Sequence, residues 1–141
     1  MYRIITAVLI TGVLTVFTGC GGSGLPDGKV RVSGKIMLDG VPLTHAGEGN
    51  FLINLANESL TETSACRFDP ADGTFSLVIA PGDYTATVQA TDGFDEDDER
   101  RGRVIPAKSL VPKKYDSLKT SDAKVTVAGN GGVITVELTS E

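Results

Sequence analysis

Apolar and polar residues alternate along most of the chain after residue 28, which is the period of a β-strand with one buried face. In the range 29–38, Val30, Val32 and Ile36 share one face, and charged or small polar residues occupy the other. This pattern is typical of a half-buried antiparallel strand. Beyond residue 20 no apolar stripe with a 3.6-residue period is sustained, so the pattern predicts no long helix.

Six further segments alternate in the same way, and turn residues such as Asp39-Gly40 and Pro81-Gly82 separate them. The segments are 51–55, 65–69, 75–79, 84–90, 124–127 and 133–138. We expect the last two to pair as a hairpin across the glycine-rich loop between them. Seven short strands at this spacing predict an all-β protein with a β-sandwich.

The stretch 91–122 breaks this rhythm. It holds six acids between Asp92 and Glu99, and arginines follow them. Pro106 and Pro112 exclude a long regular element. We therefore expect one long irregular connection, and such insertions often carry function.

The first twenty residues have the layout of an export signal. Arg3 precedes a 14-residue apolar run over 4–17, which is shorter than the roughly 20 residues that span a bilayer. Thr18-Gly19-Cys20 resembles the bacterial lipobox, which implies that residues 1–19 are removed and Cys20 is lipidated. The alternative is an ordinary signal peptide with an unmodified Cys20.

The lipobox resemblance also predicts a location. A lipidated Cys20 would anchor the protein to a membrane of the cell envelope, and residues 20–28 would form a flexible tether. Gly21 is not the Asp associated with inner-membrane retention, which favours the outer membrane. Cys66 would then lack an intramolecular partner, and its strand parity with Phe68 predicts an inward-facing, unreactive thiol.

Four short motifs follow one another in the mature chain. They are VSGKIMLDGVPL at 32–43, DGTFSL at 72–77, PGDYTATV at 81–88 and VPKKY at 111–115. Together they resemble carboxypeptidase regulatory-like domains, and the fourth resembles a segment of small bacterial lipoproteins of this type. The resemblance implies a prealbumin-like (transthyretin-like) sandwich with Greek-key connections over residues 29–141, a module that is not itself a peptidase.

Within these motifs, two kinds of residue have a physical role. Gly40, Gly73 and Gly82 suit backbone with positive φ at turns. Tyr84 is expected to bury its ring and to reach a backbone group with its hydroxyl at a corner of the sandwich.

The net charge and the types of side chain exclude several classes of function. A net charge of −5 argues against nucleic-acid binding, because phosphate recognition needs a cationic face. The single histidine, His45, follows a turn and is expected to be an exposed loop residue; one histidine provides neither a typical zinc site nor an oriented triad. We therefore expect no enzyme activity and no cofactor.

The connection 91–122 holds the candidate binding residues. Asp92, Asp95 and Asp97 are candidate Ca²⁺ ligands, with a solvated charge run as the alternative. The candidate contact surface comprises Phe94, Arg100, Arg101, Arg103, Lys113, Lys114 and Tyr115. The sequence thus predicts a non-enzymatic structural or protein-interaction module that binds an unknown envelope protein or glycan. The alternative is a carbohydrate-binding module, for which Phe94 and Tyr115 are the candidate exposed aromatics.

Overall fold

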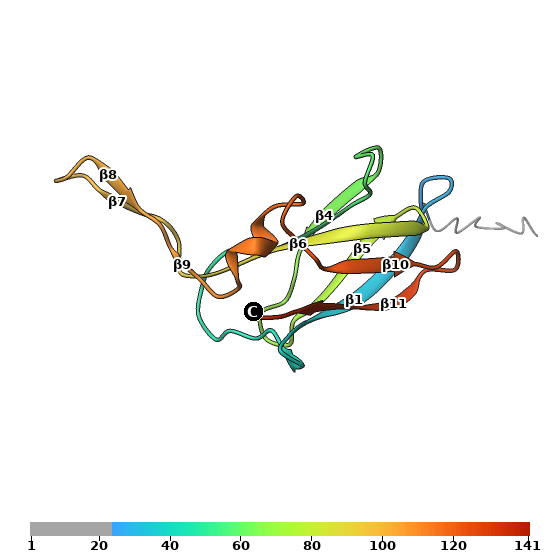
Figure 1. The fold of residues 1–141 in the computed structure, drawn as a ribbon, viewed down its shortest axis with the longest axis horizontal. Coiled ribbons are helices and arrows are strands. Elements are labelled where there is room, and N and C mark those ends of the chain that lie inside the picture. The colour runs from blue at the N-terminus through green and yellow to red at the C-terminus, as the bar shows by residue number, and fades with distance from the viewer. Residues whose placement is uncertain (1–23) are drawn as a thin grey trace, which may run out of the picture.

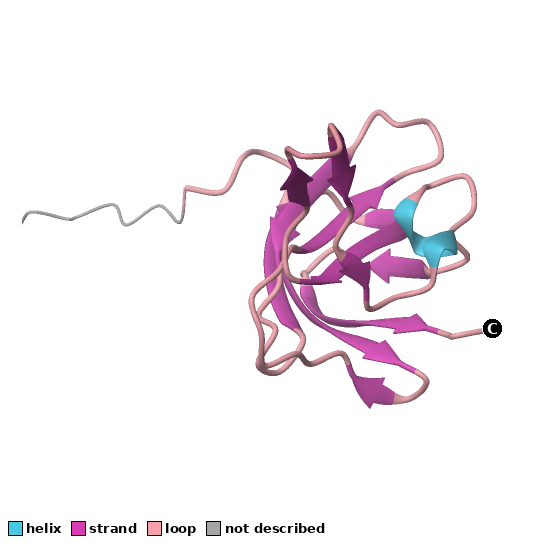
Figure 2. Cartoon of the chain, turned by 90° about the vertical axis from the view of Figure 1, so that its left-hand side faces the viewer, coloured by secondary structure: helices cyan, strands magenta, loops and turns pink. Residues whose placement is uncertain are grey.

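The computed structural model describes residues 24–141, which form two β-sheets packed face to face and a separate two-stranded sheet (Figures 1 and 2). The described residues contain eleven strands and one short 3-10 helix, η1 (Lys113–Asp116). The strands are β1 (Val30–Leu38), β2 (Val41–Pro42), β3 (Phe51–Ala56), β4 (Thr63–Arg67), β5 (Thr74–Ile79), β6 (Gly82–Asp92), β7 (Glu96–Asp98), β8 (Arg103–Ile105), β9 (Lys108–Ser109), β10 (Lys124–Val127) and β11 (Gly132–Leu138). The export signal and Cys20 lie outside the described residues. Within residues 24–141, no helix has the length and apolar character needed to cross a bilayer.

The first sheet is built around β1. Strand β11 runs parallel to it on one side, in a register that extends from Val32 opposite Gly132 to Leu38 opposite Leu138. Strand β5 lies antiparallel on the other side, and the short strand β2 pairs with the end of β1. The turn between β1 and β2 has positive φ at both central residues, Asp39 and Gly40, as a tight hairpin requires.

The second sheet has the order β10-β6-β3-β4 and is antiparallel throughout. Its longest member, β6, has 11 residues and pairs at its far end with β9. Helix η1 packs beside β6, at the side of this sheet (Figure 2).

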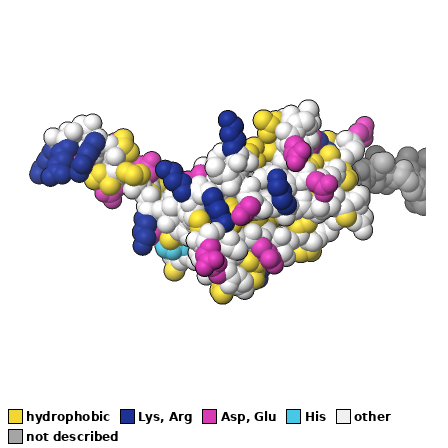
Figure 3. All heavy atoms as spheres, in the orientation of Figure 1, with side chains coloured by type: hydrophobic (Ala, Val, Ile, Leu, Met, Phe, Trp, Pro, Cys, Tyr) yellow, Lys and Arg dark blue, Asp and Glu magenta, His cyan; other side chains and the backbone are white. Residues whose placement is uncertain are grey.

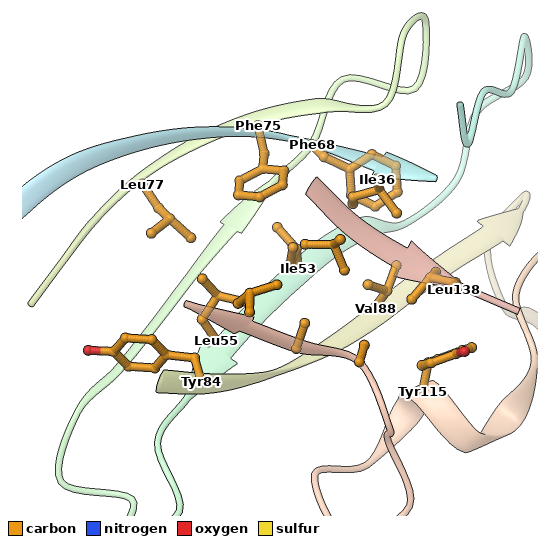
Figure 4. Close-up of a cluster of buried hydrophobic side chains, with 14 of the residues drawn as sticks. Ile36, Ile53, Leu55, Phe68, Phe75, Leu77, Tyr84, Val88, Tyr115 and Leu138 are labelled. Carbon is orange, nitrogen blue, oxygen red and sulfur yellow. The ribbon is translucent and has the colours of Figure 1, made fainter. Parts of the chain in front are cut away.

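The core lies between the two sheets and confirms the predicted alternation (Figure 4). The inward positions of β3, β5 and β6 are all buried: Phe51, Ile53, Leu55, Phe75, Leu77, Ile79, Tyr84, Ala86, Val88 and Ala90. The Tyr84 hydroxyl donates a hydrogen bond to the Ala80 carbonyl oxygen at 2.6 Å, which confirms its expected role at the corner. Gly40, Gly73 and Gly82 all have positive φ, as expected.

The predicted hairpin of segments 124–127 and 133–138 is wrong. Strand β10 pairs with β6 in the second sheet, whereas β11 pairs with β1 in the first. The glycine-rich loop between them therefore carries the chain from one sheet to the other. Alternation predicts which face of a strand is buried, and a short glycine-rich loop fits a hairpin and a sheet crossing equally well.

Three smaller expectations also need correction. The predicted strand 65–69 lies two residues earlier, as β4. The count of seven holds only for strands of four or more residues, because β2, β7, β8 and β9 are shorter. The connection 91–122 is not irregular throughout, since it contains the end of β6, three short strands and η1.

Candidate functional site

A two-stranded hairpin projects from the sandwich beyond the end of β6 (Figure 1). We call residues 94–106 the arm. Strands β7 and β8 pair antiparallel within it, with Glu96 opposite Ile105 and Asp98 opposite Arg103. Gly102, at φ 60°, completes the turn between them. No residue of the arm is buried, so the arm contributes nothing to the core.

The arm combines exposed apolar side chains with concentrated charge. Phe94, Val104 and Ile105 are 51%, 57% and 43% exposed. The Asp98 carboxylate lies 3.7 Å from Arg101 Nε and 3.8 Å from Arg103 Nε. Figure 3 shows cationic side chains at the tip of the arm and hydrophobic ones beside them. Phe94 and the arginines belong to the residue types, aromatic and arginine, that are enriched in protein contact surfaces.

The base of the arm is held by the loop before β3. Gly49 forms a bridge with Gly93, and the Asn50 amide donates a hydrogen bond to Thr91 Oγ1 at 2.9 Å. His45 belongs to the same loop, and its ring packs on Phe51 with the centroids 5.9 Å apart.

The expectation that His45 is exposed is therefore wrong. Its side chain is largely covered, and its Nε2 atom is inaccessible to solvent at 3.2 Å from Asp92 Oδ1. The cause is long-range, because the loop folds against the end of β6 and covers the imidazole ring.

The candidate calcium ligands are not brought together. Asp92 faces His45, and Asp95 accepts a hydrogen bond from the Ala107 amide at 2.9 Å. Asp97 is an exposed residue of β7. Among residues 24–141, no group of three or more acidic, histidine or cysteine side chains has an arrangement that could hold a metal ion.

Tyr115 is not a surface contact residue, contrary to expectation. It is 1% exposed in η1, and its hydroxyl accepts a hydrogen bond from the Thr139 amide at 2.8 Å. The predicted contact surface is therefore not continuous. Phe94 and the three arginines lie on the arm, whereas Tyr115 is buried in η1 and its hydrogen bond links η1 to the end of β11.

The two lysines before Tyr115 also differ. Lys113 is exposed. Lys114 is partly buried, and its Nζ lies 3.1 Å from Asp122 Oδ2, 3.0 Å from Thr139 Oγ1 and 5.0 Å from the centroid of the Tyr115 ring. Its hydrogen bond with Asp122 raises the pKa of Lys114 and lowers that of Asp122. The VPKKY motif therefore secures the connection to the C-terminal strand.

Cys66 is half-buried and packs against the edge of the core. Burial raises the pKa of its thiol, which lowers the fraction of reactive thiolate. The thiol is thus covered in part, and less completely than its strand parity predicted.

The alternation pattern does not predict the groove that lies on the outer face of the second sheet. Its volume is about 980 Å³, and its floor comprises side chains of β3 and β6, including Asn54, Thr87 and Gln89. The loop 57–60 and the segment 116–119, which begins with the last residue of η1, form part of its lining. Outward polar positions on adjacent strands are visible in the sequence, but the two flanking segments lie about 60 residues apart, and only the fold brings them together.

Comparison with known proteins adds one distant neighbour. No protein-family model matches the sequence, and no curated protein sequence matches it. Among crystal structures, the chain is similar to that of a DUF3823 family protein from Parabacteroides merdae, with 16% sequence identity and a TM-score of 0.43. The similarity covers 79% of this chain and 46% of that one, so this chain spans less than half the length of its neighbour.

Proposed function

We propose that this protein is a lipid-anchored, non-enzymatic interaction module of the bacterial cell envelope, and that its arm is the surface that contacts a partner protein. The anchor rests on the lipobox-like residues Thr18-Gly19-Cys20, and Gly21 favours the outer membrane. The module is a carboxypeptidase regulatory-like domain in this proposal. In support, the four sequence motifs occur in order, and β1 lies between a parallel last strand and an antiparallel β5.

The isolated hairpin is the observation that carries the proposed interaction. A two-stranded hairpin is marginally stable in water without a third strand or a covering element. The arm has neither within the described residues, and it presents Phe94, Val104 and Ile105 to solvent. A partner protein that packs on the arm would supply the covering element that the hairpin lacks and would bury these three side chains.

Photo-crosslinking in intact cells tests this role. A photoreactive amino acid at Ile105 of the full-length protein should give one discrete adduct with an envelope protein. Val104→Asp should abolish the adduct, because a carboxylate would be desolvated in the contact. Val133→Asp is the matched control, since Val133 is 81% exposed on β11, away from the arm, and the adduct should persist. Equal loss in both variants, or no adduct, would contradict the proposal.

The same cells test the anchor. A palmitate analogue should label the wild-type protein, and Cys20→Ala should remove the label. Labelling that survives this substitution would show that the lipid, if any, is attached elsewhere.

A further inference from the structure

The groove on the outer face of the second sheet is independent of the arm, and its chemistry indicates a ligand of a different class. We propose that this groove binds a neutral oligosaccharide. The residues that carry this inference are not the aromatics Phe94 and Tyr115, of which one lies on the arm and the other is buried.

The floor of the groove provides uncharged hydrogen-bonding groups at fixed spacing. Asn54 of β3 lies directly opposite Thr87 of β6, and Gln89 is two residues further along β6, opposite Leu52. The side-chain oxygen of Asn54, Oδ1, accepts a hydrogen bond from Thr63 Oγ1 at 2.9 Å. This bond fixes the orientation of the side-chain amide and leaves its NH2 group as a donor. Amides and hydroxyls of this kind both donate and accept, as the hydroxyls of a sugar require.

Charges at the groove are balanced. The lining contains two acidic residues, Glu58 and Asp116, and two basic residues, Lys119 and Lys124. Lys124 is already engaged, because its Nζ donates a hydrogen bond to Thr85 Oγ1 at 2.6 Å. A ligand with a net charge would meet like and opposite charges in equal number, so the groove favours a neutral ligand.

Apolar side chains accompany these polar groups. Leu52 is 39% exposed and Leu60 is 63% exposed, and both line the groove with Leu118. Sugar rings carry apolar C–H faces between their hydroxyls, and leucine side chains provide a surface for these faces. The volume of about 980 Å³ lies at the upper end of the ~300–1,000 Å³ typical of small-molecule sites, which favours several linked units over one.

An extended peptide fits the groove less well. Peptides usually bind a sheet by adding a strand at a free edge, where backbone groups are available. The floor belongs to β3 and β6, and each of these strands is paired on both sides, β3 by β4 and β6, and β6 by β3 and β10. A peptide across this face would have to satisfy its backbone with side chains alone, whereas sugar hydroxyls need only side chains.

Titration calorimetry with the full-length protein tests the proposal, and the probes are four neutral hexasaccharides: maltohexaose, cellohexaose, xylohexaose and mannohexaose. At least one should bind saturably at millimolar concentration or below. Asn54→Ala and Gln89→Ala should each weaken binding roughly tenfold, which is the loss expected from about one hydrogen bond. Asn130→Ala, an amide removal in an exposed loop outside the groove, should leave the affinity unchanged.

Several results would overturn the inference. These are no binding of any neutral hexasaccharide, preferential binding of hexagalacturonate or of a hexapeptide, and binding that survives both groove substitutions. The arm variant Val104→Asp should retain sugar binding in full, so failure of the groove and failure of the proposed partner contact are distinguishable. Because all substituted residues are outside the core, thermal unfolding should be unchanged and serves as the check on folding.

Discussion

Gly34 has no side chain, and the packing of the core depends on this absence. It lies in the middle of β1, where glycine usually weakens a strand. Its neighbour across the sheet is Phe75 of β5, and the aromatic ring occupies the space above the glycine. A Cβ atom at this position would overlap the ring and would lie 2.9 Å from the Ile134 carbonyl oxygen. The glycine therefore leaves room in the core for the Phe75 ring.

We expect Gly34→Ala to destabilise the protein by about 1–3 kcal/mol, because the added methyl group overpacks the core and displaces the Phe75 ring. Urea denaturation of the full-length protein measures this change. Ser33→Ala is the matched control on the same strand, and its effect should stay within about 0.5 kcal/mol because Ser33 is exposed. Equal stability of Gly34→Ala and the wild type would show that the ring can move at no cost.

The burial of Tyr84 can be predicted from the local sequence, whereas the burial of Tyr115 cannot. Tyr84 lies in an alternating strand next to a Pro-Gly turn, so both its burial and its hydrogen bond follow from local sequence. Tyr115 lies where no alternation exists, in a four-residue 3-10 helix. Its burial depends on the end of β11, more than twenty residues away, and only the fold brings that strand to it.

At the scale of elements, the sequence predicts strands better than it predicts their partners. The buried faces of β1, β3, β5 and β6 follow from alternation alone. The pairing of β10 and β11 does not, because both have one apolar face and each could pair with the other or with a distant strand. The hairpin of the arm does not follow from the sequence for another reason: acidic residues are rare in strands, and three of them form β7.

The ion pair between Lys29 and Glu62 links elements from both sheets. Lys29 precedes β1, Glu62 precedes β4, and the two charged atoms are 2.7 Å apart. Glu62 also accepts a hydrogen bond from the Ala80 amide, in the turn between β5 and β6, at 3.3 Å. The hydrogen bond from Lys29 is the main cause that lowers the pKa of Glu62 below its ordinary value of 4.5.

This shift predicts a pH dependence of stability. Because the folded-state pKa of Glu62 is lowered, its contribution is present above the unfolded pKa of about 4.5 and disappears as the pH falls through the folded pKa. Glu62→Gln should therefore be less stable than the wild type at neutral pH, and the difference should vanish in strong acid. Denaturant titrations across this range measure it, and Glu58→Gln, in the same connection, is the control. A constant difference at all pH values would contradict the assignment.

For the whole molecule, the arm and the start of the described chain lie at opposite ends (Figure 1). Val30 pairs with Ile79 at one end of the sandwich, next to the start of β6, whereas the arm follows the far end of β6. If Cys20 holds the protein at a membrane, as proposed, the arm lies at the end of the sandwich farther from the attachment point. This position favours a protein over a lipid as the arm's contact.

The arm is also expected to be dispensable for folding. Every side chain of residues 94–106 lies outside the core, and the ladder between β6 and β9 closes the sandwich at Asp92 and Lys108. Replacement of residues 95–106 by Asn-Gly, a pair suited to tight turns, should therefore change the stability by no more than about 0.5 kcal/mol. A shorter loop loses slightly less entropy on folding, so the small change should be in the stabilising direction.

Denaturant unfolding of the protein with the shortened arm measures this effect. Tyr115→Ala in the unshortened protein is the positive control, whose stability must fall measurably. That substitution empties a buried site and should destabilise the protein by about 3–5 kcal/mol. If the shortened protein loses as much stability as Tyr115→Ala, the arm is part of the folding unit and its exposure needs another explanation. If it keeps its stability, the fold does not need the arm, as expected of a segment that is maintained for contact.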